Sequence, residues 1–230
     1  MRLDALLSRY GYCSRREAPG WIKRHSITFK GEPCSAPTDK VQAEGILLDG
    51  EPVEFPDGLY AALYKPAGYT CSHDDGEGDV IYDLLPFQWR HRTPAVSSVG
   101  RLDKETSGLL LITDDGKFIH RMTSPRHHVA KVYEAVTEED IPAEAVELFA
   151  SGTFMLNGED RPCAPAVLEI LEPRRARLTL TEGKYHQVRR MLAAVGAPVA
   201  SLCRISIGSL HLDSLNLEPG EWMPIRPDAL

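Results

Sequence analysis

The stretch VGRLDKETSGLLLITDDG, Val99 to Gly116, indicates the fold more directly than any other part of the chain. Its apolar run from Gly108 to Thr113 predicts a strand buried on both faces, because apolar and polar positions do not alternate. The loop before this strand carries Arg101 and Asp103. A carboxylate on a loop braced by a rigid strand occupies a usual place for a catalytic group, although the two charges also fit an ordinary surface loop.

Strands and helices alternate on both sides of this buried strand. Asp114 and Asp115 are expected to cap a helix at Lys117–Thr123. The other expected strands are Leu59–Tyr64, Lys131–Thr137, Val167–Leu171, Arg177–Thr181 and Val199–Ile207, and the other expected helices are Pro142–Ala150 and Gln187–Val195. The mixture predicts an α+β fold with a mixed, largely antiparallel sheet flanked by helices.

The first 40 residues differ from the rest of the chain in charge. They hold eight Lys and Arg against four Asp and Glu, a net of +4, so the remaining 190 residues carry −11 of the total of −7. Such asymmetry indicates an appended basic module. The turn-rich segment Phe55–Gly58 is the best linker candidate. We therefore expect a small N-terminal α/β module over residues 1–56 and a larger domain over residues 57–230.

The expected elements of this module are short. Ser14 is predicted to cap a helix that carries Arg15 and Arg16. Pro19 falls inside that helix, where a proline removes a hydrogen bond unless it lies in the first turn. A strand at Ile27–Phe29 and a hairpin at Ile46–Val53 complete the predicted module.

Composition excludes several classes of protein. No apolar run approaches the roughly 20 residues that cross a bilayer, and the N-terminus lacks the apolar segment of a signal peptide. The five cysteines are scattered without the spacing of a zinc or redox site. Neither a phosphate-binding glycine loop nor a dinucleotide fingerprint is present. We therefore expect a cytoplasmic protein with no membrane partner, no metal and no cofactor.

The net charge of −7 argues at first sight against a nucleic-acid partner, but two further basic clusters lie within the acidic part. Residues 174–190 hold six Lys and Arg against one Glu, a net of +5. Residues 120–131 add His120, Arg121, Arg126, His127, His128 and Lys131. Such clusters are typical of surfaces that follow a phosphate backbone, and also of solvated faces.

Five blocks of sequence then occur in a defined order. They are RLD with SRRE in the first 17 residues, KPAG at Lys65–Gly68, GRLD with TSGLL at Gly100–Leu110, SPRHH with KVY at Ser124–Tyr133, and EGKYHQVRRM at Glu182–Met191. Together the last four resemble the pseudouridine synthases, more narrowly the RsuA-type branch that modifies ribosomal RNA. The first block resembles an S4 RNA-binding domain. The resemblance implies an enzyme that isomerises uridine to pseudouridine within RNA.

The resemblance also implies roles for single residues. Asp103 matches the catalytic aspartate, which acts either as a nucleophile at the anomeric carbon or as the base that starts a glycal route. Arg189 matches a residue that pairs with this carboxylate, and Tyr133 matches a tyrosine that stacks on the target base. Arg101 matches an arginine that fills the gap left by the flipped nucleotide. The other expected substrate-binding residues are Lys65, Arg126, Lys131, His186, Gln187, Arg190, Arg15 and Arg16.

The implied partner is ribosomal RNA. The residues around Tyr133 and His186 are most similar to enzymes for uridine 516 of 16S rRNA, acting as monomers on a small-subunit assembly intermediate. One alternative is a large-subunit 23S rRNA enzyme of the same branch, and another is a non-catalytic rRNA-binding or ribosome-assembly protein. A nucleoside or glycoside hydrolase is less favoured, because Glu105 and Asp114 give no clear acid–base partner.

Overall fold

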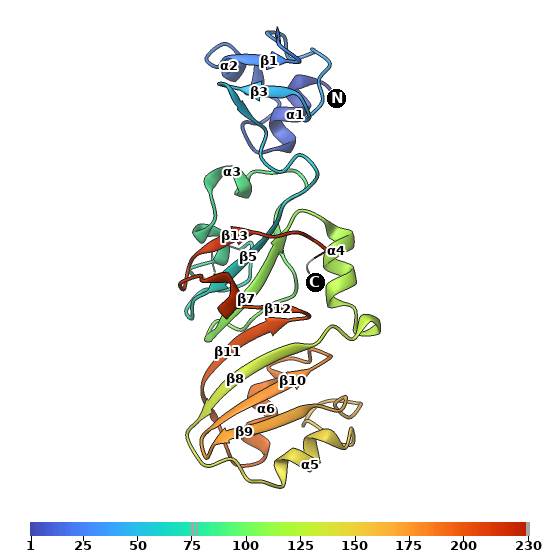
Figure 1. The fold of residues 1–230 in the computed structure, drawn as a ribbon, viewed down its shortest axis with the longest axis vertical. Coiled ribbons are helices and arrows are strands. Elements are labelled where there is room, and N and C mark those ends of the chain that lie inside the picture. Colours follow the sequence, from blue (N-terminus) through green and yellow to red (C-terminus); the bar gives the residue numbers. More distant parts are fainter. Residues whose placement is uncertain (75, 77, 229–230) are drawn as a thin grey trace.

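Two β-sheets organise the chain (Figure 1). The computed structural model describes residues 1–74, 76 and 78–228. A four-stranded antiparallel sheet with the order β2-β1-β3-β4 is built from the N-terminal part. Its elements are α1 (Leu3–Arg9), α2 (Ala18–Ile22), β1 (Ile27–Phe29), β2 (Glu32–Pro33), β3 (Ile46–Leu48) and β4 (Glu51–Pro52). The predicted strand and hairpin of this part are present.

Helix α2 is shorter than the sequence predicts. Ser14 does begin the segment: its N–H donates to Glu17 Oε2 at 3.0 Å, and the N–H of Glu17 donates to Ser14 Oγ at 3.3 Å. This reciprocal pair is a capping box, but regular helix begins only at Ala18. Pro19 lies in the first turn of α2, a position where a proline is tolerated because an N–H there has no partner within the helix. Arg15 and Arg16 consequently lie in the preceding turn.

The nine-stranded sheet has the order β13-β5-β7-β11-β8-β10-β9, with β6 and β12 paired to β7 and β11. Its strands are β5 (Tyr60–Lys65), β6 (Ser97–Ser98), β7 (Thr106–Thr113), β8 (Lys131–Thr137), β9 (Val167–Glu172), β10 (Arg175–Leu180), β11 (Val199–Ile207), β12 (Leu210–His211) and β13 (Trp222–Pro224). Within the described residues, β7 and β11 form the single parallel pair. The predicted mixed, largely antiparallel sheet is therefore confirmed.

Strand β7 is buried on both faces, as the apolar run predicts. Leu110 packs on one face with residues of β5 and α3 (Phe87–Arg90), and Leu109 packs on the other with α4 (Gly116–Thr123). The remaining helical segments are α5 (Ala145–Ala150), α6 (Gln187–Ala194), η2 (Ile81–Leu84), η3 (Pro125–His127) and η4 (Asp213–Leu215). Helices α5 and α6 cover the part of the sheet formed by β8, β9 and β10 (Figure 1). No helix of the described chain is long and apolar enough to cross a membrane.

Of the two residues expected to cap α4, Asp115 does so and Asp114 does not. Asp115 accepts hydrogen bonds from two N–H groups in the first turn of α4. Asp114 instead pairs with Arg92, whose Nη2 lies 2.9 Å from Asp114 Oδ2 and whose side chain is 2% exposed. The Arg92 guanidinium also lies 4.9 Å from the ring centroid of Tyr10. This buried ion pair therefore joins the N-terminal part to the large sheet.

Candidate active site

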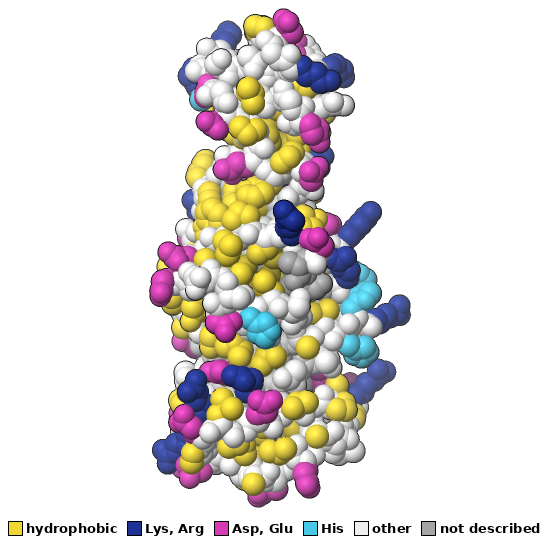
Figure 2. Space-filling model, viewed as in Figure 1, with side chains coloured by type: hydrophobic (Ala, Val, Ile, Leu, Met, Phe, Trp, Pro, Cys, Tyr) yellow, Lys and Arg dark blue, Asp and Glu magenta, His cyan; other side chains and the backbone are white. Residues whose placement is uncertain are grey.

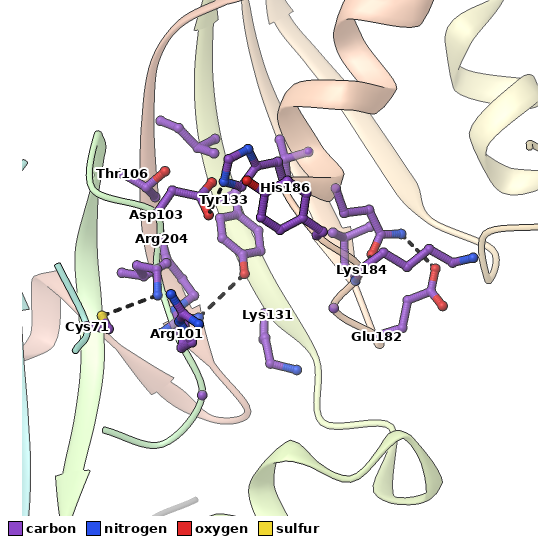
Figure 3. Close-up of a pocket in the computed structure, with 18 of the residues that line it drawn as sticks. Cys71, Arg101, Asp103, Thr106, Lys131, Tyr133, Glu182, Lys184, His186 and Arg204 are labelled. Atoms are coloured by element: carbon purple, nitrogen blue, oxygen red, sulfur yellow. Dashed lines mark hydrogen bonds and ion pairs between the residues drawn. The ribbon is translucent and has the colours of Figure 1, made fainter. Parts of the chain in front are cut away.

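A cavity of about 530 Å³ opens beside the start of β7 and the middle of β8 and β11 (Figure 3). It brings together four segments that are far apart in the sequence. Arg101, Asp103 and Thr106 come from the loop before β7 and its first residue, Lys131 and Tyr133 from β8, His186 and Gln187 from the start of α6, and Arg204 from β11. All the residues expected to be catalytic therefore lie in or beside one hollow.

Asp103 lies on the loop before β7 with its side chain 30% exposed. The sequence led us to expect Arg189 as its partner, and Arg189 does lie at ion-pair distance, with Nε 4.0 Å from Asp103 Oδ2. His186, which was not expected in this role, is nearer, with Nε2 at 3.2 Å from Asp103 Oδ1. Arg189 also donates to the carbonyl oxygens of Val199 and Glu105 at 3.3 and 3.1 Å. The arginine thus supplies a fixed positive charge beside the carboxylate, while the histidine makes the short contact.

The segment before α6 is braced by Gln187 rather than left free for substrate. Gln187 is buried, and its Oε1 accepts the Lys184 N–H at 2.9 Å while its Nε2 donates to Glu182 Oε1 at 2.6 Å. His186, the residue before Gln187, adopts the left-handed conformation with φ +46°. This turn therefore directs the imidazole of His186, one residue before the helix, at Asp103.

Tyr133 is supported by Arg204, a residue that the sequence analysis did not identify. Arg204 is 2% exposed; its Nε donates to the Leu109 carbonyl at 2.8 Å, and its Nη1 lies 3.5 Å from Tyr133 Oη (Figure 3). Among the described residues, its Nη2 has no hydrogen-bond partner. A buried arginine is costly unless paired, and this one is held in place by its bonds to β7 and to Tyr133. The available signal was one charge within the apolar strand SLCRISI.

Lys131 lines the cavity as expected, opposite Arg204. Burial lowers the pKa of its amine, and the nearby Arg204 charge lowers it further. The side chain is half-buried, and Nζ donates to the Val129 carbonyl at 3.3 Å. Because Lys131 and Arg204 are both cationic, this wall of the cavity favours an electron-rich occupant.

Lys65 has a different place from the one expected. Its side chain is fully buried, and Nζ donates to the carbonyl oxygens of Pro66, Lys104 and Thr106 at 3.0, 3.1 and 2.7 Å. Burial lowers the pKa of this amine. Lys65 therefore joins β5 to the loop that carries Asp103 and does not reach the cavity.

Replacing Lys65 with methionine is accordingly expected to lower the free energy of unfolding by about 2 kcal/mol, because three buried carbonyl groups lose their donor. Urea denaturation measures this loss, with the exposed Lys23→Met as the control that leaves stability unchanged. RNA affinity of the folded protein is expected to stay within about twofold of wild type. Unchanged stability together with weakened RNA binding would show that Lys65 contacts substrate after all.

One edge of the molecule is basic. Figure 2 shows Lys, Arg and His side chains projecting where α4 and η3 lie, and the exposed members are Lys117, His120, Arg121, Arg126, His127 and His128. Arg101 is also exposed and lines the cavity. Positive charge gathered on one side of an acidic protein is the footprint of a polyanionic partner.

Three other expected RNA contacts lie away from the cavity. Arg190 pairs with Glu159 at 2.8 Å and donates to the Asn157 carbonyl at 2.5 Å, so it braces the segment before α6. Arg15 and Arg16 are exposed in the N-terminal part, and Arg15 lies 3.5 Å from Asp4. Within the described residues, no group of three or more His, Cys, Asp or Glu is placed to hold a metal.

Comparisons with known proteins agree with this arrangement. The family model described as RNA pseudouridylate synthase matches residues 59–194. The ribosomal small subunit pseudouridine synthases A of Pasteurella multocida and Escherichia coli K12 are each 39% identical to the chain and cover 100% of it, with 98% of each relative covered. A crystal structure of a pseudouridylate synthase superposes with a TM-score of 0.69 at 36% identity, over 99% of this chain and 97% of that one. The chain therefore belongs to the RNA pseudouridylate synthase family, in which it is an RNA pseudouridine synthase of the RsuA type.

Proposed function

We propose that the protein converts uridine 516 of 16S ribosomal RNA to pseudouridine, with Asp103 as the catalytic carboxylate. The observation that carries this proposal is the position of Asp103: partly exposed in a cavity, 3.2 Å from His186 and facing Tyr133 across the hollow (Figure 3). The relatives that match the whole chain are named for the small ribosomal subunit, which favours its rRNA as the substrate.

The reaction breaks the N1–C1′ bond of uridine, turns the uracil and forms a C5–C1′ bond, so the RNA keeps its mass. The C5 proton is lost and N1 gains a proton; no electron leaves or enters. Asp103 either attacks C1′ or removes a sugar proton to start a glycal route. In both routes an ionised carboxylate faces a sugar that develops positive character, which it stabilises directly.

The other cavity residues hold the base during this rearrangement. The target uridine must leave its stack, and a pocket with an aromatic wall and polar floor receives it. Tyr133 provides the aromatic face, and Arg204, whose Nη1 contacts Tyr133 Oη, keeps that ring in place. Arg101, exposed at the rim, is the side chain that takes the place of the flipped nucleotide in the RNA.

RNA capture by the rest of the protein rests on charge. We assign residues 1–56 to an S4-like module that uses Arg15 and Arg16, and residues 57–230 to the catalytic domain. Arg126 and the other exposed side chains of the basic edge then contact phosphates near the cavity. The proposed setting is the cytoplasm, where a monomer acts on a small-subunit assembly intermediate.

Mapping pseudouridine in rRNA from cells with and without the protein tests the proposal. We expect the modification at position 516 of 16S rRNA to disappear without the protein and to return when the wild-type chain is supplied. Loss at a 23S rRNA position instead would refute the proposed target while leaving the enzyme class intact. An unchanged map in both subunits would refute action on rRNA.

A further inference from the structure

Tyr185 is a large aromatic side chain left in solvent at the rim of the cavity. It is 74% exposed, the highest value among the large hydrophobic side chains described as exposed, and it lines the same hollow as Asp103. The mechanism above gives it no task. Aromatic rings on rigid segments beside an active site are typical stacking surfaces for single-stranded RNA.

The ring is held in position before any ligand arrives. It stacks on the imidazole of His186 with centroids 3.8 Å apart and planes 18° from parallel. The Tyr185 carbonyl accepts a hydrogen bond from Arg190 Nη1 at 2.9 Å, and Arg190 is itself fixed by Glu159. His186 covers one ring face, so the exposed surface is chiefly the opposite face and the ring edge. A ring that is already ordered loses little conformational entropy on binding.

The stack is also tied to the reacting group. His186 lies between Tyr185 and Asp103, stacking on the one and contacting the other at 3.2 Å. When the sugar of the target nucleotide reaches Asp103, the adjacent nucleotide of the RNA therefore lies at the rim of the cavity, next to Tyr185. When the target base leaves its stack, the neighbouring base loses a stacking partner as well, and an open aromatic face replaces it.

We propose that Tyr185 stacks on an unpaired nucleobase adjacent to the uridine that enters the cavity. The inference rests on the proposed RNA substrate and names a second subsite for it, beside the base pocket. Stacking reads the π face that all four bases share, so this subsite selects an unpaired neighbour and is tolerant of its identity. It favours a target in a loop or in an rRNA segment that has not yet paired.

The test uses the full-length protein and a synthetic RNA stem-loop containing uridine 516 with its flanking nucleotides. Tyr185→Ala is expected to weaken binding by about tenfold, whereas Tyr185→Phe keeps the ring and stays within about twofold of wild type. In single-turnover experiments the RNA concentration for half-maximal rate rises for Tyr185→Ala, while the saturating rate is unchanged. A purely structural effect through His186 and Asp103 would lower the saturating rate.

An abasic substitution on either side of the uridine identifies the stacked base. For wild type, one of the two abasic RNAs is expected to bind about tenfold more weakly than the intact RNA. For Tyr185→Ala, the same abasic RNA is expected to bind as tightly as the intact RNA, because the ring that the base would contact is already missing. The matched control is Phe87→Ala, since Phe87 is 68% exposed and its ring also packs against a histidine, His91, but lies on α3 outside the cavity. We expect this control to bind both RNAs as wild type does.

Equal affinity of Tyr185→Ala and wild type, or equal sensitivity of both to each abasic RNA, would overturn the inference. Affinity is measured without turnover, so this outcome is separate from the proposed function. A wild-type protein that binds the stem-loop but forms no pseudouridine at position 516 would count against the proposed target alone.

Discussion

Asp103→Asn is expected to lower the rate of pseudouridine formation by about four orders of magnitude or more, which is the usual cost of removing a nucleophile or an essential base. The amide is nearly isosteric, so the cavity keeps its shape. It cannot attack C1′ or accept a sugar proton, and it carries no charge to stabilise the sugar. The measurement is single-turnover conversion of the uridine 516 stem-loop. Pseudouridine has the same mass as uridine, so it is identified by separating the nucleosides of the digested RNA.

Binding separates this effect from a loss of folding or of RNA capture. Asp103→Asn is expected to bind the stem-loop within about threefold of wild type and to unfold at the same urea concentration. Asp83→Asn is the matched control, because Asp83 is an exposed carboxylate paired with Arg90 outside the cavity. Product formed by Asp103→Asn at a rate near wild type would remove Asp103 from the mechanism, and free uracil as the product would indicate a hydrolase.

Gly108→Ala is expected to give the largest loss of stability, about 3 kcal/mol or more in the free energy of unfolding. Gly108 pairs with Arg204 where β7 and β11 run parallel, and its φ is +111°. A Cβ at this position would collide with the Arg204 carbonyl oxygen and lie 2.5 Å from its backbone nitrogen. These are backbone atoms in the middle of the sheet, so they have no room to withdraw.

Urea denaturation measures the effect, and Gly20→Ala is the matched control. Gly20 lies in helix α2 with open space around the position of a Cβ, so alanine is expected to leave stability equal or raise it by about 0.5–1 kcal/mol. Because Arg204 supports Tyr133, Gly108→Ala is also expected to lower turnover in the fraction that remains folded. Wild-type stability in this variant would mean that β7 and β11 are further apart than described.

Strands β8 and β11 show how far local sequence predicts this fold. Lys131–Thr137 and Val199–Ile207 are strands with the bounds that the sequence indicates, because hydrophobic patterning and turn residues are local signals. The expected helix after Ser14 is wrong in length for a related reason. The cap is a local feature and is present, but Pro19 has no N–H to donate to the carbonyl of residue 15, so regular helix begins only at Ala18.

The candidate site divides in a similar way. Asp103 and Tyr133 could be singled out from ordered motifs, because a motif records residue type and spacing. The motifs also indicate Arg189 as a partner of Asp103, and it lies 4.0 Å away, but they do not predict the shorter contact from His186. One charge within an apolar strand was the signal for Arg204, but the burial of Lys65 and Arg204 could not be predicted, since the loop and strands that enclose them come from other parts of the chain.

The sequence by itself determined the strand and helix types, the basic clusters hidden within a net charge of −7, and the carboxylate on the loop before β7. These follow from side-chain periodicity, turn chemistry and charge, which act over a few residues. Only the tertiary structure decided that His186 faces Asp103, that Arg204 lies under Tyr133 and that Lys65 is buried. Those outcomes depend on the register of β7, β11 and β8, which the packing of the whole core sets.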